Sequence, residues 1–178
     1  GLCMALLRKW GFELVLGDSG VSRRELLEGM GYAFSVADAE VPKGEGPPKE
    51  ENMSGIGEKE RQRAWPGKMA KAKAVAIKYY VYKKRQPLVI LITCSRIVVD
   101  AKGQVIPTQA LTTPSTLHAT VSRLSNQTLT VYSSVWVHNL ANGHSSHATE
   151  KGEVTFGNVP TSVAERIAVS PQAAAAGG

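Results

Sequence analysis

The segment 88–99 constrains the fold most strongly, because it is the most apolar stretch of the chain. Its sequence, L-V-I-L-I-T-C-S-R-I-V-V, is rich in β-branched residues and does not alternate between apolar and polar side chains. Such a run is typical of a strand that is covered on both faces. The segment therefore predicts a buried strand in a sheet.

Shorter segments with strand and helix patterns lie on both sides of this run. Strands are predicted at 12–16, 34–36, 129–139 and 154–156, and helices from Ser22, over 68–80, from Thr113 or Ser115, and from Thr161. Ser22 and Glu25 have the spacing of a capping box. Strands separated by helices predict an α/β or mixed α+β fold in one domain.

Two segments have a composition that does not favour a packed structure. Residues 41–67 are rich in proline, glycine and charge, which predicts a flexible loop or insertion. Residues 169–178 are predicted to form a disordered tail.

Composition limits the classes of protein that the chain can belong to. No apolar run approaches the roughly 20 residues that a membrane-spanning helix needs, so no membrane partner is expected. The two cysteines, Cys3 and Cys94, are far apart in the sequence and show no metal-binding spacing. A reducing intracellular compartment, and hence a cytoplasmic location, is the expectation.

The net charge of +6 has two interpretations. Much of the excess falls within residues 68–85, which contain six lysines and one arginine. We expect a solvated helix face and a basic turn there. The alternative, a nucleic-acid-binding surface, stays open but is disfavoured, because Trp65, Trp136 and Tyr79 do not form a clear stacking platform.

Histidine and cysteine side chains give no strong signal for chemistry. Cys94 is expected to fill the core as a strand residue rather than to act as a nucleophile. The tract G-H-S-S-H at 143–147 follows the strong turn signal Asn142-Gly143 and has no acidic partner nearby. We expect it to be a solvated loop.

The stretch 16–32, L-G-D-S-G-V-S-R-R-E-L-L-E-G-M-G-Y, has the layout of an anion site. A strand ends, a turn of small residues follows, and a helix begins with two arginines. A helix N-terminus offers free N–H groups to an anion, and arginine adds a fork that matches two phosphate oxygens. Basic residues at a helix start run against the helix dipole, which favours an anion-binding role for Arg23 and Arg24.

The same stretch, continued to A-F, resembles the opening motif of the Maf (septum formation) family, L-[GA]-S-x-S-x-x-R-R-x-[IL]-L followed by G-Y-x-F. Further similarities follow in the same order as in the family. Residues 69–74 resemble its L-A-x-x-K-A motif, 89–99 its apolar strand, and 124–135 its L-S-G-x-x-H-x-V motif. The segments V-H-N-L-A-N-G and E-V-T-F-G-N-V-P are similar to the plant and algal branch.

The resemblance implies a nucleoside triphosphate pyrophosphatase with one Maf-like domain at 12–168. Such enzymes hydrolyse a nucleoside triphosphate to a monophosphate and pyrophosphate with a divalent metal, often Mg²⁺. The implied fold is an α/β fold, a mixed central sheet flanked by helices with a phosphate cleft. Arg23 matches the family's phosphate-facing arginine, with Arg24 beside it, and Lys73 matches its helix lysine, a second phosphate contact.

The departures from the family pattern fall on the catalytic residues. Asp18 and Gly20 stand where the family has two loop serines, and Ser19 is a partial substitute for phosphate binding. Asp18 places a negative charge where phosphate oxygens should lie. Glu40 is the carboxylate that aligns best with the family's acidic pair. Which residues bind the metal is left open by the sequence.

The largest departure is Ser95, which stands at the position of the family's aspartate, the proposed base or metal ligand. A serine hydroxyl has no pKa near neutrality and does not hold Mg²⁺ as a carboxylate does. We therefore expect weak or absent turnover, and a non-catalytic nucleotide-binding or interaction protein is the alternative. No counterpart of the family's C-terminal part follows Ile167, so a truncated chain and a homodimer that supplies this part both stay open.

Overall fold

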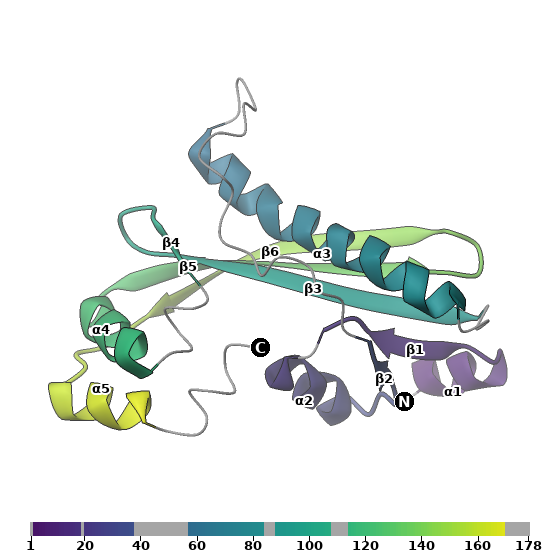
Figure 1. The fold of residues 1–178 in the computed structure, drawn as a ribbon, viewed down its shortest axis with the longest axis horizontal. Coiled ribbons are helices and arrows are strands. Elements are labelled where there is room, and N and C mark those ends of the chain that lie inside the picture. The colour runs from purple at the N-terminus through teal and green to yellow at the C-terminus, as the bar shows by residue number, and fades with distance from the viewer. Residues whose placement is uncertain (1, 19, 38–56, 84–87, 108–113, 170–178) are drawn as a thin grey trace. The chain divides into compact units, whose positions relative to one another are not determined.

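The computed structural model describes residues 2–18, 20–37, 57–83, 88–107 and 114–169 (Figure 1). The order of elements in these residues is α1 (Leu2–Lys9), β1 (Glu13–Leu16), α2 (Val21–Gly29), β2 (Ser35–Val36), α3 (Glu58–Lys83), β3 (Val89–Val99), β4 (Val105–Ile106), α4 (Pro114–Leu124), β5 (Thr128–Asn139), β6 (Ser145–Thr155) and α5 (Thr161–Ala168). No helix among the described residues combines the length and the apolar character that crossing a bilayer requires.

The strands form one six-stranded sheet in the order β2-β1-β3-β5-β6, with β4 paired to β3. Strand β1 runs parallel to β2 and to β3, whereas β4 runs antiparallel to β3. Along β3 the side chains alternate between buried and partly exposed positions, as the pleat of a strand requires. The mixed sheet with flanking helices confirms the fold class that the sequence predicted.

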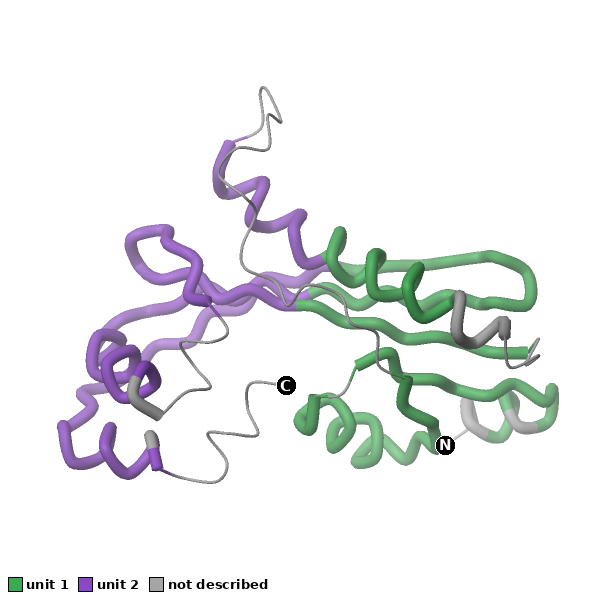
Figure 2. The backbone as a smooth tube through the Cα atoms, viewed as in Figure 1, with its two compact units in different colours: residues 1–42, 67–95, 134–148 green, residues 43–66, 96–133, 149–178 purple. Residues whose placement is uncertain are grey.

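The chain packs as two compact units, drawn in two colours in Figure 2. Unit 1 comprises residues 1–42, 67–95 and 134–148, and unit 2 comprises residues 43–66, 96–133 and 149–178. The main core cluster of unit 1 consists of Val15, Ala74, Ile77, Val89, Leu91 and Leu140. Unit 2 contains three smaller clusters. The boundary of one domain at 12–168 stays a prediction.

Helix α3 corrects the predicted extent of the loop at 41–67. The helix begins at Glu58, so the last part of that segment is helical, whereas 41–56 lies outside the described residues. The run E-K-E-R-Q-R consists of good helix formers, and Glu58 and Glu60 in the first turn suit the helix dipole. The helix continues through the buried Pro66, against the usual effect of an interior proline.

The structure differs from the sequence prediction in two further helices, α1 and α2. The sequence did not predict α1. The capping box of Ser22 and Glu25 was wrong, because α2 begins at Val21 with Gly20 as its N-cap and no side-chain cap. The backbone N–H of Gly20 is bound instead by the carboxylate of Asp18, 2.8 Å away. Asp18 thus binds the N–H of the N-cap residue just before the helix and does not cap the first turn.

Candidate anion-binding site

The end of β1 is held tightly against β3 and α3 within unit 1. Leu16 lies opposite Ile92 in the parallel register, and the N–H of Gly17 donates to the carbonyl of Ile92 at 2.7 Å. A Cβ atom on Gly17 would lie 2.5 Å from Ile77 Cδ1 and 2.7 Å from Thr93 Cγ2. Only glycine fits at this contact, and it brings the next residue, Asp18, between α2 and α3.

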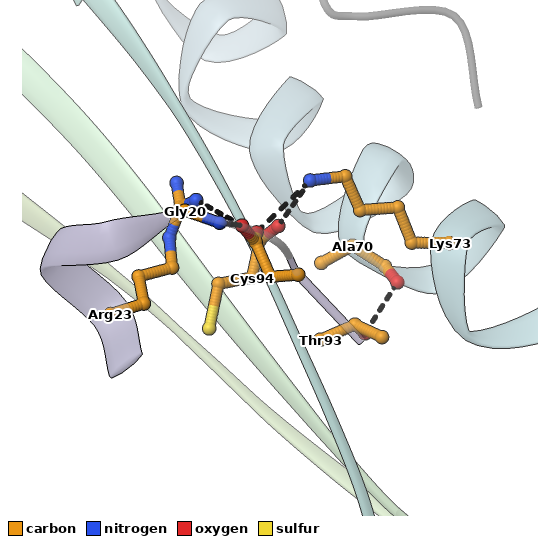
Figure 3. A network of polar contacts seen from close by, with 7 residues as sticks. Gly20, Arg23, Ala70, Lys73, Thr93 and Cys94 are labelled. Atoms are coloured by element: carbon orange, nitrogen blue, oxygen red, sulfur yellow. Dashed lines mark hydrogen bonds and ion pairs between the residues drawn. The ribbon is translucent and has the colours of Figure 1, made fainter. Parts of the chain in front are cut away.

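Asp18 is buried, with 3% of its surface exposed, and its carboxylate binds two cationic side chains. Oδ1 accepts hydrogen bonds from the Gly20 N–H at 2.8 Å and from Arg23 Nη1 at 2.7 Å. Oδ2 accepts from Lys73 Nζ at 3.2 Å. Figure 3 shows Arg23 and Lys73 reaching this carboxylate from opposite sides. We call Asp18, Gly20, Arg23 and Lys73 the Asp18 cluster.

A contact between α3 and β3 fixes the position of Lys73. The Thr93 hydroxyl donates to the carbonyl of Ala70 at 2.6 Å, and Ala70 lies one helical turn before Lys73. The ammonium of Lys73 also donates to the carbonyl of Cys94 at 3.1 Å. These bonds tie the lysine to the segment of β3 that precedes Ser95.

Charge compensation keeps Asp18 ionised despite its burial. Burial alone would raise the pKa of the carboxyl group, but the Arg23 guanidinium, the Gly20 N–H and the Lys73 ammonium outweigh it. The pKa of Asp18 is therefore lowered from its ordinary value. One carboxylate between two cations leaves the Asp18 cluster with a formal charge of +1.

Cys94 lies within the electrostatic field of the cluster, but it does not have the character of a nucleophile. Burial raises the pKa of its thiol, and the nearby Asp18 raises it further, against the opposing effects of Arg23 and Lys73. A thiol with a raised pKa stays protonated at neutral pH, and the thiolate is the reactive form.

The structure brings together some of the predicted site residues. Arg23 and Lys73 converge, as a shared anion site requires. Ser95 is half-buried in β3 and follows Cys94, whose carbonyl binds Lys73. Arg24 is half-buried in α2 and forms no ion pair among the described residues. Ser19 and Glu40 lie outside the described residues.

Sequence reasoning missed the role of Asp18 itself. The motif showed a carboxylate where a serine was expected, but not that the side chain pairs with both cations. The spacing of five residues to Arg23 was a local signal. The partner 55 residues away, Lys73, could be identified only once α3 was placed.

The described residues do not fit a divalent metal ion. They contain no group of three or more His, Cys, Asp or Glu side chains that could hold one. The Asp18 carboxylate already binds a guanidinium, an ammonium and an N–H, so a metal ion there would meet two positive charges at close range. The metal implied by the resemblance therefore has no ligand set in this part of the chain.

Asp100, the other carboxylate that follows an apolar strand, stabilises a turn. Its Oδ1 accepts from the backbone N–H groups of Lys102 and Gln104, each at 2.9 Å. Its Oδ2 lies 3.9 Å from Arg123 Nη1. These contacts close the turn between β3 and β4 within unit 2.

Comparisons with known proteins identify the family of the chain. A comparison with curated proteins found no match. The model of the Maf-like protein family matches residues 13–178, which are the bulk of the chain. The chain therefore belongs to the Maf-like protein family.

Proposed function

We propose that this chain binds the phosphate groups of a nucleoside triphosphate at the Asp18 cluster and converts it to a monophosphate and pyrophosphate slowly or not at all. Members of the family are generally nucleoside triphosphate pyrophosphatases that depend on a divalent metal. Membership supports a nucleotide as the ligand. The geometry of the cluster supports the position of its phosphates and the low turnover.

The convergence of Arg23 and Lys73 on one buried anion is the observation that carries the proposal. A guanidinium, an ammonium and an N–H at the start of a helix are the groups with which proteins bind phosphate. Here they bind the oxygens of Asp18, at 2.7, 3.2 and 2.8 Å. The carboxylate therefore stands in for the oxygens of an anionic ligand.

An incoming phosphate has to compete with Asp18 for the same donors. Either the carboxylate turns away or Arg23 and Lys73 each share their donors with a second anion. Both changes weaken charge-assisted hydrogen bonds, which contribute about 1.5–3 kcal/mol each. We therefore propose weaker binding than a serine at position 18 would give.

Slow turnover follows from what the described part of the site lacks. Phosphoryl transfer depends on positioning and on neutralising the charge that develops. Ser95 supplies no carboxylate at the position of the family's aspartate, and the described residues hold no metal ligand set. Loss of a general base alone slows a reaction by about 10²-fold or more.

The alternative is a nucleotide-binding or interaction protein without turnover on the same fold. Ser19 and Arg24 stay proposed phosphate contacts, and Glu40 and Ser95 stay proposed members of the catalytic set. Mg²⁺ as the metal, a homodimer and a cytoplasmic location are further proposals that rest on the sequence.

Calorimetric titration of ATP, GTP, CTP and UTP with Mg²⁺, combined with a pyrophosphate-release assay, tests the proposal. We expect saturable binding and a turnover at least about 10²-fold below that of a family member with the intact aspartate. Binding without release of pyrophosphate favours the non-catalytic alternative. Lack of binding to every nucleotide contradicts the proposal.

Two lysines on α3 provide a matched pair of variants. Lys73→Ala removes an ammonium of the Asp18 cluster and should weaken nucleotide binding by about tenfold or more. Lys71→Ala removes the same charge two residues away, on a different face of the helix, and should leave nucleotide binding within about twofold of the unmodified protein. Equal losses in both variants would indicate a general effect of charge instead of a site.

A further inference from the structure

A second candidate site lies in unit 1, between α3 and the hairpin of β5 and β6. We propose that this hollow binds a small planar aromatic anion, a single ring that carries a carboxylate or a phosphate. Its volume is about 250 Å³, and its lining residues are Lys71, Ala74, Val75, Lys78, Trp136, His138 and Ser145. The inference is independent of the proposed function, because it uses none of the residues of the Asp18 cluster.

The helix contributes one face to this hollow. Positions 71, 74, 75 and 78 follow the i, i+3, i+4, i+7 spacing, which places four side chains on the same side of α3. Lys73 lies about 200° around the helix from Lys71, because each residue turns the helix by about 100°. The Asp18 cluster and the hollow therefore use different faces of one helix.

The walls of the hollow suit an aromatic ring. Ala74 and Val75 offer aliphatic surface from the helix, and Trp136 offers an indole from β5. The imidazole of His147 on β6 is stacked with this indole, with centroids 4.7 Å apart and planes at 13°. Trp136 also packs against the core cluster of unit 1, so its ring is held from two directions.

The charges at the hollow suit an anion. Lys71 Nζ lies 5.6 Å from the centroid of the Trp136 ring, and Lys78 lines the same hollow one further turn along the helix. The lining residues include two lysines and no carboxylate. A ligand that brings a negative charge would therefore meet complementary charge at the mouth of an apolar hollow.

His138 provides the polar group that would orient the ligand. Its Nε2 atom is buried and has no hydrogen-bond partner among the described residues. An unpaired buried nitrogen costs about 1–3 kcal/mol, which a hydroxyl or carboxyl group of a ligand would recover once the imidazole turns this atom toward the hollow. Burial and the nearby Lys78 ammonium lower the pKa of this imidazole, so it is neutral at neutral pH.

The volume of the hollow favours a single-ring ligand over larger ligands. Sites for drug-sized ligands have volumes of about 300–1,000 Å³. A single-stranded nucleic acid needs aromatic side chains in succession along a basic groove. The stack of Trp136 and His147 is one aromatic pair, and Trp136 lines this hollow.

Calorimetric titration of the full chain with two probes tests the inference. The probes are 4-hydroxybenzoate and phenyl phosphate, which separate a carboxylate from a phosphate as the preferred charge. Phenol and acetate are the matched controls, since phenol has the aromatic ring without the anionic group and acetate has the carboxylate without the ring. We expect saturable binding of at least one probe, and about tenfold or weaker binding of both controls.

Variants of α3 locate the binding. Val75→Glu introduces a negative charge at a position that is 64% exposed, so the helix should tolerate it, and should weaken binding of the aromatic anions by more than about tenfold. Ala72→Glu adds the same charge at an exposed position of α3 outside the hollow and should change affinity by less than about twofold. Lys71→Ala should weaken binding of 4-hydroxybenzoate, whereas Lys73→Ala should not. Binding of phenyl phosphate that depends on Lys73 would belong to the Asp18 cluster and not to the hollow.

Three results would overturn the inference. The first is no saturable binding of either probe to the unmodified chain. The second is unchanged affinity in both Val75→Glu and Lys71→Ala. The third is salt-sensitive binding of an oligothymidylate that Val75→Glu abolishes while neither probe binds, which would assign the hollow to nucleic acid.

Discussion

Two buried carboxylates, Asp18 in unit 1 and Asp100 in unit 2, satisfy their charge in different ways. Asp100 binds backbone N–H groups two and four residues ahead, with Arg123 at the longer distance of 3.9 Å. Asp18 binds the guanidinium of Arg23 and the ammonium of Lys73. The hydrogen-bond donors to Asp100 belong to its own turn, whereas the two cations that bind Asp18 come from two helices. These cations are the residues that the resemblance predicted as phosphate contacts. Under the proposed function, the difference separates a structural carboxylate from one that occupies the position of a ligand's phosphate.

Substitution of each aspartate by asparagine should give the largest difference in stability between the two positions. Asp18→Asn keeps the shape but removes the negative charge between two cations, and should lower the free energy of unfolding by about 3 kcal/mol. Asp100→Asn keeps an oxygen that can accept both turn N–H groups, and should cost less than about 1 kcal/mol. Urea unfolding of both variants measures the difference. Equal losses at the two positions would show that the charge of Asp18 does not matter.

The glycines beside the two carboxylates should also respond differently. Gly17→Ala forces a Cβ against Ile77 and Thr93 and should cost about 2 kcal/mol through overpacking. Gly103 has a φ of +80° and open space around its Cα, so Gly103→Ala should cost about 1 kcal/mol through backbone strain. Gly29→Ala, in open space at the end of α2, is the control and should be neutral or slightly stabilising. Thermal unfolding checks the order, and a cost at Gly17 no larger than at Gly29 would contradict the close packing.

The pH dependence of stability should identify Asp18 as a compensated charge. Its pKa in the folded state is below its ordinary value of 3.8, so below pH 3.8 the unfolded chain binds more protons than the folded chain. The stability contributed by the carboxylate is present above pH 3.8 and is lost as the pH falls through the folded pKa. The slope reaches at most about 1.4 kcal/mol per pH unit for one group. Urea midpoints measured from pH 5 downwards should fall less steeply for Asp18→Asn than for the unmodified chain, and parallel curves would contradict the assignment.

The sequence predicted those features that depend on local pattern. The strand at β3, the alternation of β5, the turn at Gly143 with its φ of +77°, and the helix from Thr161 are confirmed. Such features arise from periodicity and turn chemistry within short windows. The prediction that β3 is covered on both faces was wrong, because its alternate side chains are partly exposed. The start of α3 was missed because prolines and glycines at 41–67 outweighed the helix formers near its end. The site was predicted only as a set of residues, since the pairing of Asp18 with Lys73 depends on where α3 lies against the sheet.

The stack of Trp136 and His147 also could not be predicted from local sequence patterns. Each residue was considered in the sequence, Trp136 as one of several scattered aromatics and His147 as part of a solvated loop. They meet because β5 and β6 are neighbours in the sheet, and cross-strand pairs depend on a register that the sequence does not display. The hollow beside them depends further on α3.

The affinity of pyrophosphate for the unmodified chain and for Asp18→Ser tests the central claim most directly. The claim is that the carboxylate of Asp18 occupies the position of a ligand's phosphate oxygens. Calorimetric titration at neutral pH should show about tenfold or tighter binding to Asp18→Ser, because Arg23 and Lys73 then have no internal anion. Asp18→Asn is the second variant with the native shape, and circular dichroism checks that both are folded. Equal or weaker binding of pyrophosphate to the two folded variants would contradict the account.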